Sequence, residues 1–199
     1  MSKTSTKLIT SVLFFLLIFV SAGYAQQIVI NEVVSSNKSI VKDEYDAYSD
    51  WIELYNTTDQ EINLKGYYLS DDSTEPLKWQ FTQDIIIAAK DRIIVWASDV
   101  SSAPSGLHTN FKIGKEGEAI VLSAPDGTLE DELPAIAIPD NMSYGRFPDG
   151  SSFLHFFPVP TAHTANANPA NTVLINEVMS SNKTVLADSR GMYEDWIEL

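Results

Sequence analysis

The chain has 199 residues, no cysteine and a formal net charge of −14 at pH 7. Without cysteine no disulfide can stabilise the fold, so stability has to come from a packed core. The acidic surface repels nucleic acid and anionic lipid at long range, so we expect no nucleic-acid partner; it suits solubility, or the binding of cations and basic partners.

The first 25 residues have the three-part pattern of a secretory signal peptide. Lys3 and Lys7 precede the apolar stretch 8–20, and residues 23–25 (Gly-Tyr-Ala) fit a cleavage site. The alternative is a signal anchor that stays in the membrane, but the apolar stretch is shorter than the ~20 residues that a spanning helix needs. We therefore expect cleavage after Ala25, no transmembrane segment in the mature chain, and a secreted or cell-surface location.

From Gln27 onward the sequence predicts an all-β fold. Short β-branched and aromatic runs alternate with turn residues, and helical periodicity is absent over any long window. Many short strands with frequent turns favour an antiparallel β-sandwich, and a small closed barrel is the alternative. The expected strands are residues 28–34, 51–56, 62–64, 67–69, 77–81, 85–87, 92–97, 119–122, 128–133 and 154–157, with brief pairing at 111–113.

For two of these strands the sequence also predicts which faces are buried. In 51–56, Ile52 and Leu54 share one face, while Trp51 and Glu53 share the other. Residues 92–97 are almost continuously apolar, which predicts burial on both faces.

A short stretch occurs twice at a fixed offset. Residues 30–33 (Ile-Asn-Glu-Val) and 50–54 (Asp-Trp-Ile-Glu-Leu) reappear 145 positions later, at 175–178 and 195–199. A repeat of this length has the size of a domain. We expect a complete domain at 28–157, a linker at 158–172 that is rich in Pro, Ala and Asn, and the truncated start of a second domain at 173–199. A lone opening segment cannot bury its apolar face, so 173–199 should be disordered or pair with an edge strand of the first domain.

Several of these stretches together resemble the lamin tail domain family in its exported bacterial form. The similarity lies in residues 30–33, 50–56 and 64–71, then in 117–122, 125–128 and 143–150. It implies an immunoglobulin-like β-sandwich without catalytic activity. Exported relatives often accompany kinase-like domains of the spore-coat-protein-H type, nucleases or other hydrolases. Unlike nuclear lamins, this chain has no heptad rod and no basic localisation stretch, so filament assembly and chromatin binding are not carried over.

No catalytic constellation is evident. The chain has no Gly-x-Ser-x-Gly elbow and no Gly-rich phosphate loop, and its three histidines (His108, His155 and His163) lie far apart in the sequence. Glu32 and Glu53 are acids inside strands, which acid–base chemistry could use. The simpler interpretation is structural: both accept hydrogen bonds from loop amides or hydroxyls, for which residues 35–37 are candidate donors.

Carboxylates crowd two loops, where loop oxygens could bind calcium, although neither loop has the EF-hand spacing. We expect no cofactor, with calcium as the one candidate. The candidate ligands are Asp43, Glu44, Asp46 and Asp50 in the first loop and Asp71 and Asp72 in the second.

The sequence favours an exported, non-catalytic module of the lamin-tail type that works in tandem and binds a protein or a cell-surface polymer. One alternative is an accessory N-terminal module of a longer secreted enzyme, namely a hydrolase, a nuclease or a spore-coat-protein-H-like kinase. Another is a carbohydrate-binding module, if its aromatic residues form a sugar-stacking platform rather than core. The aromatics concerned are Trp51, Trp79, Trp96, Tyr67 and Tyr68.

Overall fold

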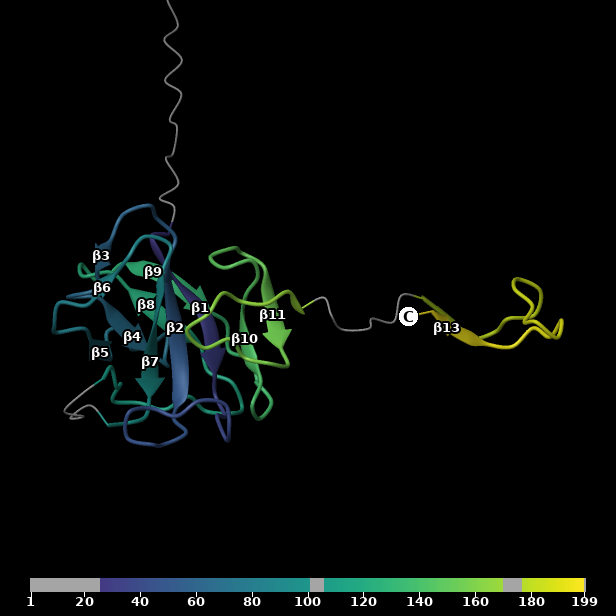
Figure 1. The fold of residues 1–199 in the computed structure, drawn as a ribbon, viewed down its shortest axis with the longest axis horizontal. Coiled ribbons are helices and arrows are strands. Elements are labelled where there is room, and N and C mark those ends of the chain that lie inside the picture. The colour runs from purple at the N-terminus through teal and green to yellow at the C-terminus, as the bar shows by residue number, and fades with distance from the viewer. Residues whose placement is uncertain (1–25, 101–105, 170–176, 199) are drawn as a thin grey trace, which may run out of the picture.

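The computed structural model describes residues 26–100, 106–169 and 177–198. The expected signal peptide lies outside them. The described residues form strands and contain no α-helix, so none of them forms a helix that could cross a membrane (Figure 1). The strands of residues 26–169 are β1 (Ile28–Val34), β2 (Asp50–Asn56), β3 (Ile62–Asn63), β4 (Tyr68–Ser70), β5 (Trp79–Gln80), β6 (Ile86–Ile87), β7 (Arg92–Ala97), β8 (Ile120–Ser123), β9 (Leu129–Leu133), β10 (Ser143–Arg146) and β11 (Leu154–Phe157).

Two antiparallel sheets make a sandwich. The five-stranded sheet has the order β11-β10-β1-β2-β7, and the four-stranded sheet has the order β5-β4-β8-β9. Strands β3 and β6 form a separate short pair. The prediction of an antiparallel β-sandwich is confirmed, and the separate sheets exclude a single closed barrel. Residues 111–113 form no strand.

The core lies between the two sheets. The five-stranded sheet contributes Ile52, Leu54 and Val95, and the four-stranded sheet contributes Leu69 and Leu122. The alternation predicted for residues 51–56 is confirmed, because Trp51 belongs to a different apolar cluster. Continuous burial of β7 is confirmed as well: Val95 and Ala97 face the main core, whereas Ile94 and Trp96 join Trp51 on the opposite face.

Strand β1 changes face halfway along its length. Its register with β2 passes from Ile30↔Leu54 to Glu32↔Glu53, so Asn31 is an extra residue in a β-bulge. Before the bulge Ile28 and Ile30 point into the main core, and after it Val33 does. Without the bulge, Glu32 would follow Ile30 into the core at a spacing of two residues. The bulge instead leaves Glu32 on the outer face.

Residues 158–166, which we call the strap, cross the outer face of the five-stranded sheet (Figure 1). Ala162 of the strap packs against the cluster of Trp51, Ile94 and Trp96. The strap is the first part of the expected linker at 158–172, and residues 170–172 of that linker lie outside the described residues. The strap contains no strand, and hydrogen bonds with carboxylates of the sheet hold it in place.

The second copy forms a hairpin. Strands β12 (Glu177–Met179) and β13 (Trp196–Glu198) pair with each other in the register Glu177↔Glu198, which repeats Glu32↔Glu53. They pair with no strand of residues 26–100 or 106–169, so pairing with an edge of the first domain is not observed. The expected first residues of this copy, 173–176, and Leu199 lie outside the described residues.

Candidate functional site

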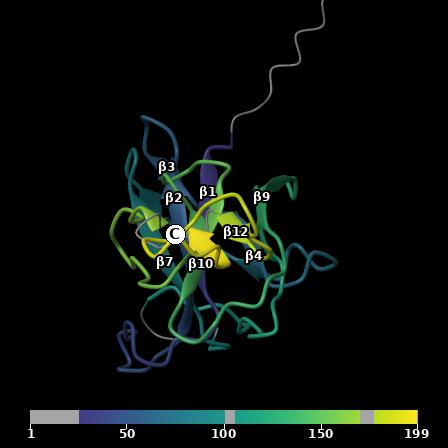
Figure 2. The same cartoon turned by 90° about the vertical axis from the view of Figure 1, so that its right-hand side faces the viewer.

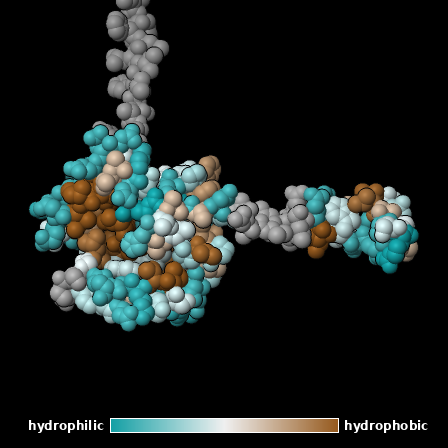
Figure 3. All heavy atoms as spheres, viewed as in Figure 1, coloured by the Kyte–Doolittle hydropathy of each residue, from teal (hydrophilic) through white to brown (hydrophobic). Residues whose placement is uncertain are grey.

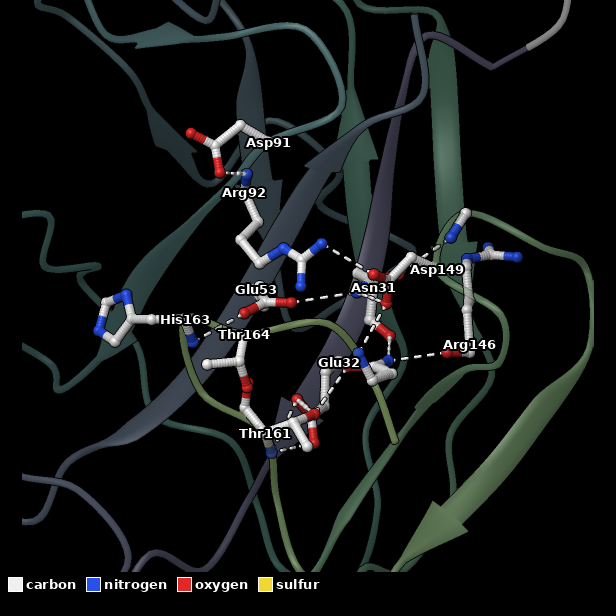
Figure 4. Close-up of polar contacts among 12 residues, drawn as sticks. Asn31, Glu32, Glu53, Asp91, Arg92, Arg146, Asp149, Thr161, His163 and Thr164 are labelled. Carbon is white, nitrogen blue, oxygen red and sulfur yellow. Dashed lines mark hydrogen bonds and ion pairs between the residues drawn. The ribbon is translucent and has the colours of Figure 1, made fainter. Parts of the chain in front are cut away.

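Glu32 and Glu53 lie side by side on β1 and β2, and both are fully buried under the strap (Figure 4). The backbone N–H of Thr161 donates to Glu32 Oε1 at 3.0 Å, and its hydroxyl donates to Glu32 Oε2 at 2.9 Å. The hydroxyl of Ser143 on β10 also donates to Glu32, and the backbone N–H of His163 donates to Glu53 Oε2 at 3.1 Å. The two carboxylates therefore fasten the strap to the sheet.

Asn31, the bulge residue, links this pair to a third acid. Its side-chain amide donates to Glu53 Oε1 and to Asp149 Oδ1, at 3.0 Å each. Arg92 of β7 forms an ion pair with Asp149 at 2.8 Å. Asn166 at the end of the strap donates its backbone N–H to Asp149 and its side-chain amide to the carbonyl of Asn31. The bulge, the strap and the β10–β11 turn thus form one polar network.

Burial raises the pKa of both glutamates. For Glu53, loss of hydration is the main cause, the hydrogen bond from Asn31 acts against it, and the charge of Glu32 adds to the rise; the pKa reaches about 8. The pKa of Glu32 is also raised by burial, against its hydrogen bonds to Ser143 and Thr161. Because both side chains are sealed from solvent, a substrate has no access to them. The arrangement matches the structural interpretation, with donors from the strap in place of residues 35–37.

A cavity of about 940 Å³ lies at one end of the sandwich. Its walls come from the β1–β2 loop, from the end of β7 and from the segment before β8. Figures 1 and 2 show the β1–β2 loop at the lower end of the sheets. Hydrophilic residues cover the lower end of the face seen in Figure 3, and separate apolar patches lie above them. Loops at the ends of a β-sandwich are a common place for binding sites.

Asn37 organises the loop that forms this cavity. Its side-chain amide donates to the carbonyls of Val41 (2.6 Å) and Ser49 (2.8 Å), and its backbone N–H donates to Asp50 Oδ1 (3.0 Å). Asp43 accepts backbone N–H bonds from Tyr45 and Ala47 in the same loop. These bonds hold the loop in a fixed shape from within.

Tyrosine, lysine and hydroxyl side chains line the cavity. Tyr45 and Tyr48 are each 45% exposed, and the ring of Tyr45 lies 5.4 Å from that of the buried His108. His108 in turn contacts the Ser98 hydroxyl at 2.8 Å and Glu44 at 3.0 Å. The basic and hydroxyl-bearing lining residues are Lys38, Lys112, Lys115, Ser35, Ser36, Ser49 and Ser98.

The candidate calcium ligands do not converge. Among the described residues no group of three or more His, Cys, Asp or Glu side chains is arranged to hold a metal ion. Each of the six carboxylates has a nearby partner of its own instead. These partners are Tyr45, Ala47 and Ser49 for Asp43, His108 for Glu44, Lys42 for Asp46, Asn37 for Asp50, Lys78 for Asp71 and Thr74 for Asp72.

The aromatic residues considered for a sugar platform do not form one. Trp51 is completely buried, and Trp96 is 7% exposed beside it. Trp79, Tyr67 and Tyr68 are half-buried, and the first two of these pack against the main core. The exposed tyrosines at the cavity are different residues, Tyr45 and Tyr48.

Sequence reasoning missed the strap residues and the lining of the cavity. Thr161 and Asn166 lie in a stretch without apolar periodicity, and their partners on β1, Glu32 and Asn31, are more than a hundred positions earlier in the chain. Lys112 and Lys115 reach the cavity through a segment with no regular structure. The available signal was the pair of polar residues Asn31 and Glu32 inside an apolar strand, which implied partners but did not identify them.

We compared the sequence with models of known protein families, and one model matches. The family model of the Lamin Tail Domain matches residues 22–136, more than half of the chain. No curated protein matches the sequence.

Proposed function

Because the chain belongs to the lamin tail domain family, whose members are non-enzymatic immunoglobulin-like domains, we propose that it is an exported, non-catalytic binding and spacer module that works in tandem at the cell surface or outside the cell. The observation that carries the proposal is the contrast between its two polar sites. The acid pair Glu32 and Glu53 is sealed beneath the strap, whereas the cavity at the loop end is large, preformed and lined by polar side chains. Preformed concave sites of this kind bind ligands.

Export is supported by the signal-peptide pattern of residues 1–25. N-terminal sequencing of the product from the native host tests it. We expect a mature chain that begins at Gln26 in the medium or on the cell surface. A product that retains residues 1–25 in the membrane would establish the signal anchor instead.

Tandem use is supported by the repeat and by the loop of the second copy. Asn182 donates to the carbonyls of Leu186 and Glu194 and its N–H to Asp195, which repeats the contacts of Asn37 with residues 41, 49 and 50. The intact mass of the exported product, with the reading frame around this segment sequenced, tests it. A second complete domain supports tandem use, and a downstream catalytic domain would make this chain an accessory module of an enzyme.

Binding is tested by mixing the mature chain with isolated cell envelopes of the host. We expect co-sedimentation, and we expect it to weaken when Lys112 and Lys115 of the cavity are changed to glutamine. Co-sedimentation that those substitutions leave unchanged would move the binding role away from the cavity.

A further inference from the structure

The lysines that line the cavity form no ion pairs with the described residues, although the chain as a whole is acidic. Of the lysines and arginines that the structure describes between residues 26 and 169, only Lys38, Lys112 and Lys115 have no carboxylate oxygen within 4.0 Å. All three line the cavity. The other basic side chains of this part pair with acids, and these are Lys42, Lys65, Lys78, Lys90, Arg92 and Arg146. Each of these six side chains therefore has a carboxylate partner, whereas the three lysines of the cavity have none among the described residues.

The carboxylates that line the cavity do not form ion pairs with these three lysines. Asp43 accepts hydrogen bonds from Ser49, Ala47 and Tyr45 within the loop. Asp50 is half-buried and accepts the N–H of Asn37; burial raises its pKa, and the charges of Lys112 and Lys38 act against that rise. Both acids support the wall of the cavity, and the ammonium groups remain available to a ligand.

The rest of the lining suits a polar ligand with flat faces. Tyr45 and Tyr48 expose nearly half of their surface, and aromatic rings of this kind offer an apolar face with a polar edge. The ammonium group of Lys42 lies over one face of the Tyr48 ring, 5.3 Å from its centroid. The hydroxyls of Ser36, Ser49 and Ser98 contact Asp140, Asp43 and His108, and each oxygen can still accept a hydrogen bond from a ligand. The hydroxyl of Ser35, which also lines the cavity, is buried and has no hydrogen-bond partner in the described residues. A ligand in the cavity would supply that partner.

We propose that the cavity binds a short acidic saccharide, with lysines pairing its carboxylates and tyrosines covering its rings; this rests on the proposed binding role. The volume of about 940 Å³ is at the upper end of the range of small-ligand sites, which fits a few sugar units. Hydroxyl and ammonium groups beside aromatic faces match a ring that carries polar groups on its edge and C–H groups on its face. An acidic peptide would use the lysines but has less need for exposed aromatic faces.

The net charge of the chain limits how anionic this ligand is. At −14, the protein repels a dense polyanion such as nucleic acid as the polyanion approaches to within about the ~8 Å screening length of physiological salt. A saccharide with one carboxylate per ring, or with a single acidic end, reaches the lysines of the cavity with less repulsion from the surrounding acidic surface. The cavity therefore selects for moderate charge on a sugar framework.

Titration calorimetry of the mature chain with trigalacturonate tests this inference, with the methyl ester of the same trisaccharide as the uncharged control. We expect the acid to bind, the ester to bind at least tenfold more weakly, and the affinity for the acid to fall as NaCl is raised from about 50 to 500 mM. Lys112→Gln with Lys115→Gln should weaken binding of the acid about tenfold. Lys65→Gln with Lys90→Gln removes the same charge away from the cavity and should leave affinity unchanged. Tyr48→Leu tests the contribution of the aromatic face, and each variant is first compared with the wild type by thermal unfolding.

Three results would contradict the proposed ligand. Equal affinity for acid and ester, with backbone amide NMR shifts at Tyr48 and Ser98, would overturn the acidic ligand and keep the cavity as a binding site. Equal loss in the Lys65/Lys90 control would show that only net charge matters and would also overturn the inference. No binding of trigalacturonate at millimolar concentration would overturn it outright, while co-sedimentation with envelopes would decide the binding role separately.

Discussion

Gly145 is the residue where β10 comes closest to β1. A Cβ added at Gly145 would lie 2.8 Å from the Cα of Glu32, closer than real Cβ contacts come, and closer still to the carbonyl oxygen of Asn31. Both obstacles are backbone atoms of the bulge, and backbone cannot move aside as a side-chain end can. The glycine is therefore required by space rather than by its φ angle.

We predict that Gly145→Ala destabilises the fold by about 3 kcal/mol, in the range of overpacked cores, because the substitution pushes β10 away from β1. Urea unfolding followed by tryptophan fluorescence measures the change. Gly114→Ala is the matched control, since the nearest atoms to its new Cβ belong to the flexible carboxylate of Glu118. A loss at Gly145 no larger than that at Gly114 would contradict the close approach of the strands.

Glu53 gives the fold a pH dependence whose sign follows from its raised pKa. An unfolded glutamate has a pKa near 4.5, and in the folded protein the pKa of Glu53 is about 8. Between these values the folded state binds more protons than the unfolded state, so the free energy of unfolding decreases as the pH rises. Glu32 adds to the effect in the same direction, because its pKa is also raised by burial.

We therefore predict a higher melting temperature at pH 6 than at pH 8.5. Differential scanning calorimetry across this range measures the slope. In Glu53→Gln no group titrates at this position, so the slope should become smaller whatever the overall change in stability. A melting temperature that rises from pH 6 to pH 8.5 in the wild type would refute the assignment.

At the scale of elements, the strap is held by hydrogen bonds rather than by an apolar face of its own. Asn166 is buried and donates from its side chain to the carbonyls of Arg146 (2.7 Å) and Asn31 (3.2 Å). We predict that Asn166→Ala costs about 2 kcal/mol, because two buried carbonyls lose their donor. Chemical denaturation measures this loss. His163→Asn is the control: it keeps the backbone N–H that reaches Glu53, changes an exposed side chain and suits the positive φ of 64°, so we expect a change below about 0.5 kcal/mol.

Protection from hydrogen exchange tests the same contact without a substitution. The backbone N–H of Thr161 and of His163 donate to buried carboxylates, so their exchange should be slow. Rapid exchange of both, at the rate of an exposed loop, would show that the strap is not docked in solution.

The strap also marks the limit of what the sequence predicts. The bounds of β1, β7 and β11 were predicted to the residue, because short β-branched and aromatic runs between turn residues define such strands. The bulge at Asn31 was not predicted, and the carbonyl of Asn31 accepts a hydrogen bond from Asn166 of the strap, more than a hundred positions later. The lysines of the cavity could not be predicted for the same reason. Lys38 and Lys112 are far apart in the sequence, and only the folded chain brings them to one cavity. Side-chain bonds between distant loops have no periodic signal, so they emerge only from the structure.

At the scale of the whole molecule, the chain contains nearly the same hairpin in two environments. The loop is closed in the same way in both, with Asn182 and Asp195 repeating Asn37 and Asp50. Burial differs sharply. Ile52 is fully buried in the first copy, whereas the equivalent Ile197 is 60% exposed in the second. Local sequence therefore closes the loop, and the sandwich around the first copy supplies the burial.

We predict that the second hairpin opens far more easily than the first. An isolated two-stranded hairpin is at best marginally stable in water, whereas β1 and β2 form the centre of a five-stranded sheet. Hydrogen exchange of the full chain should therefore give strong protection for Ile52 and Leu54 and weak protection for Val178 and Ile197. Asn182→Ala should abolish the remaining protection of the second hairpin without changing the melting temperature of the sandwich, while Asn37→Ala should lower that temperature. Equal protection of the two hairpins in a monomer would mean that the exposed apolar residues of the second copy are covered in solution, and its stability would then need a source other than its own loop.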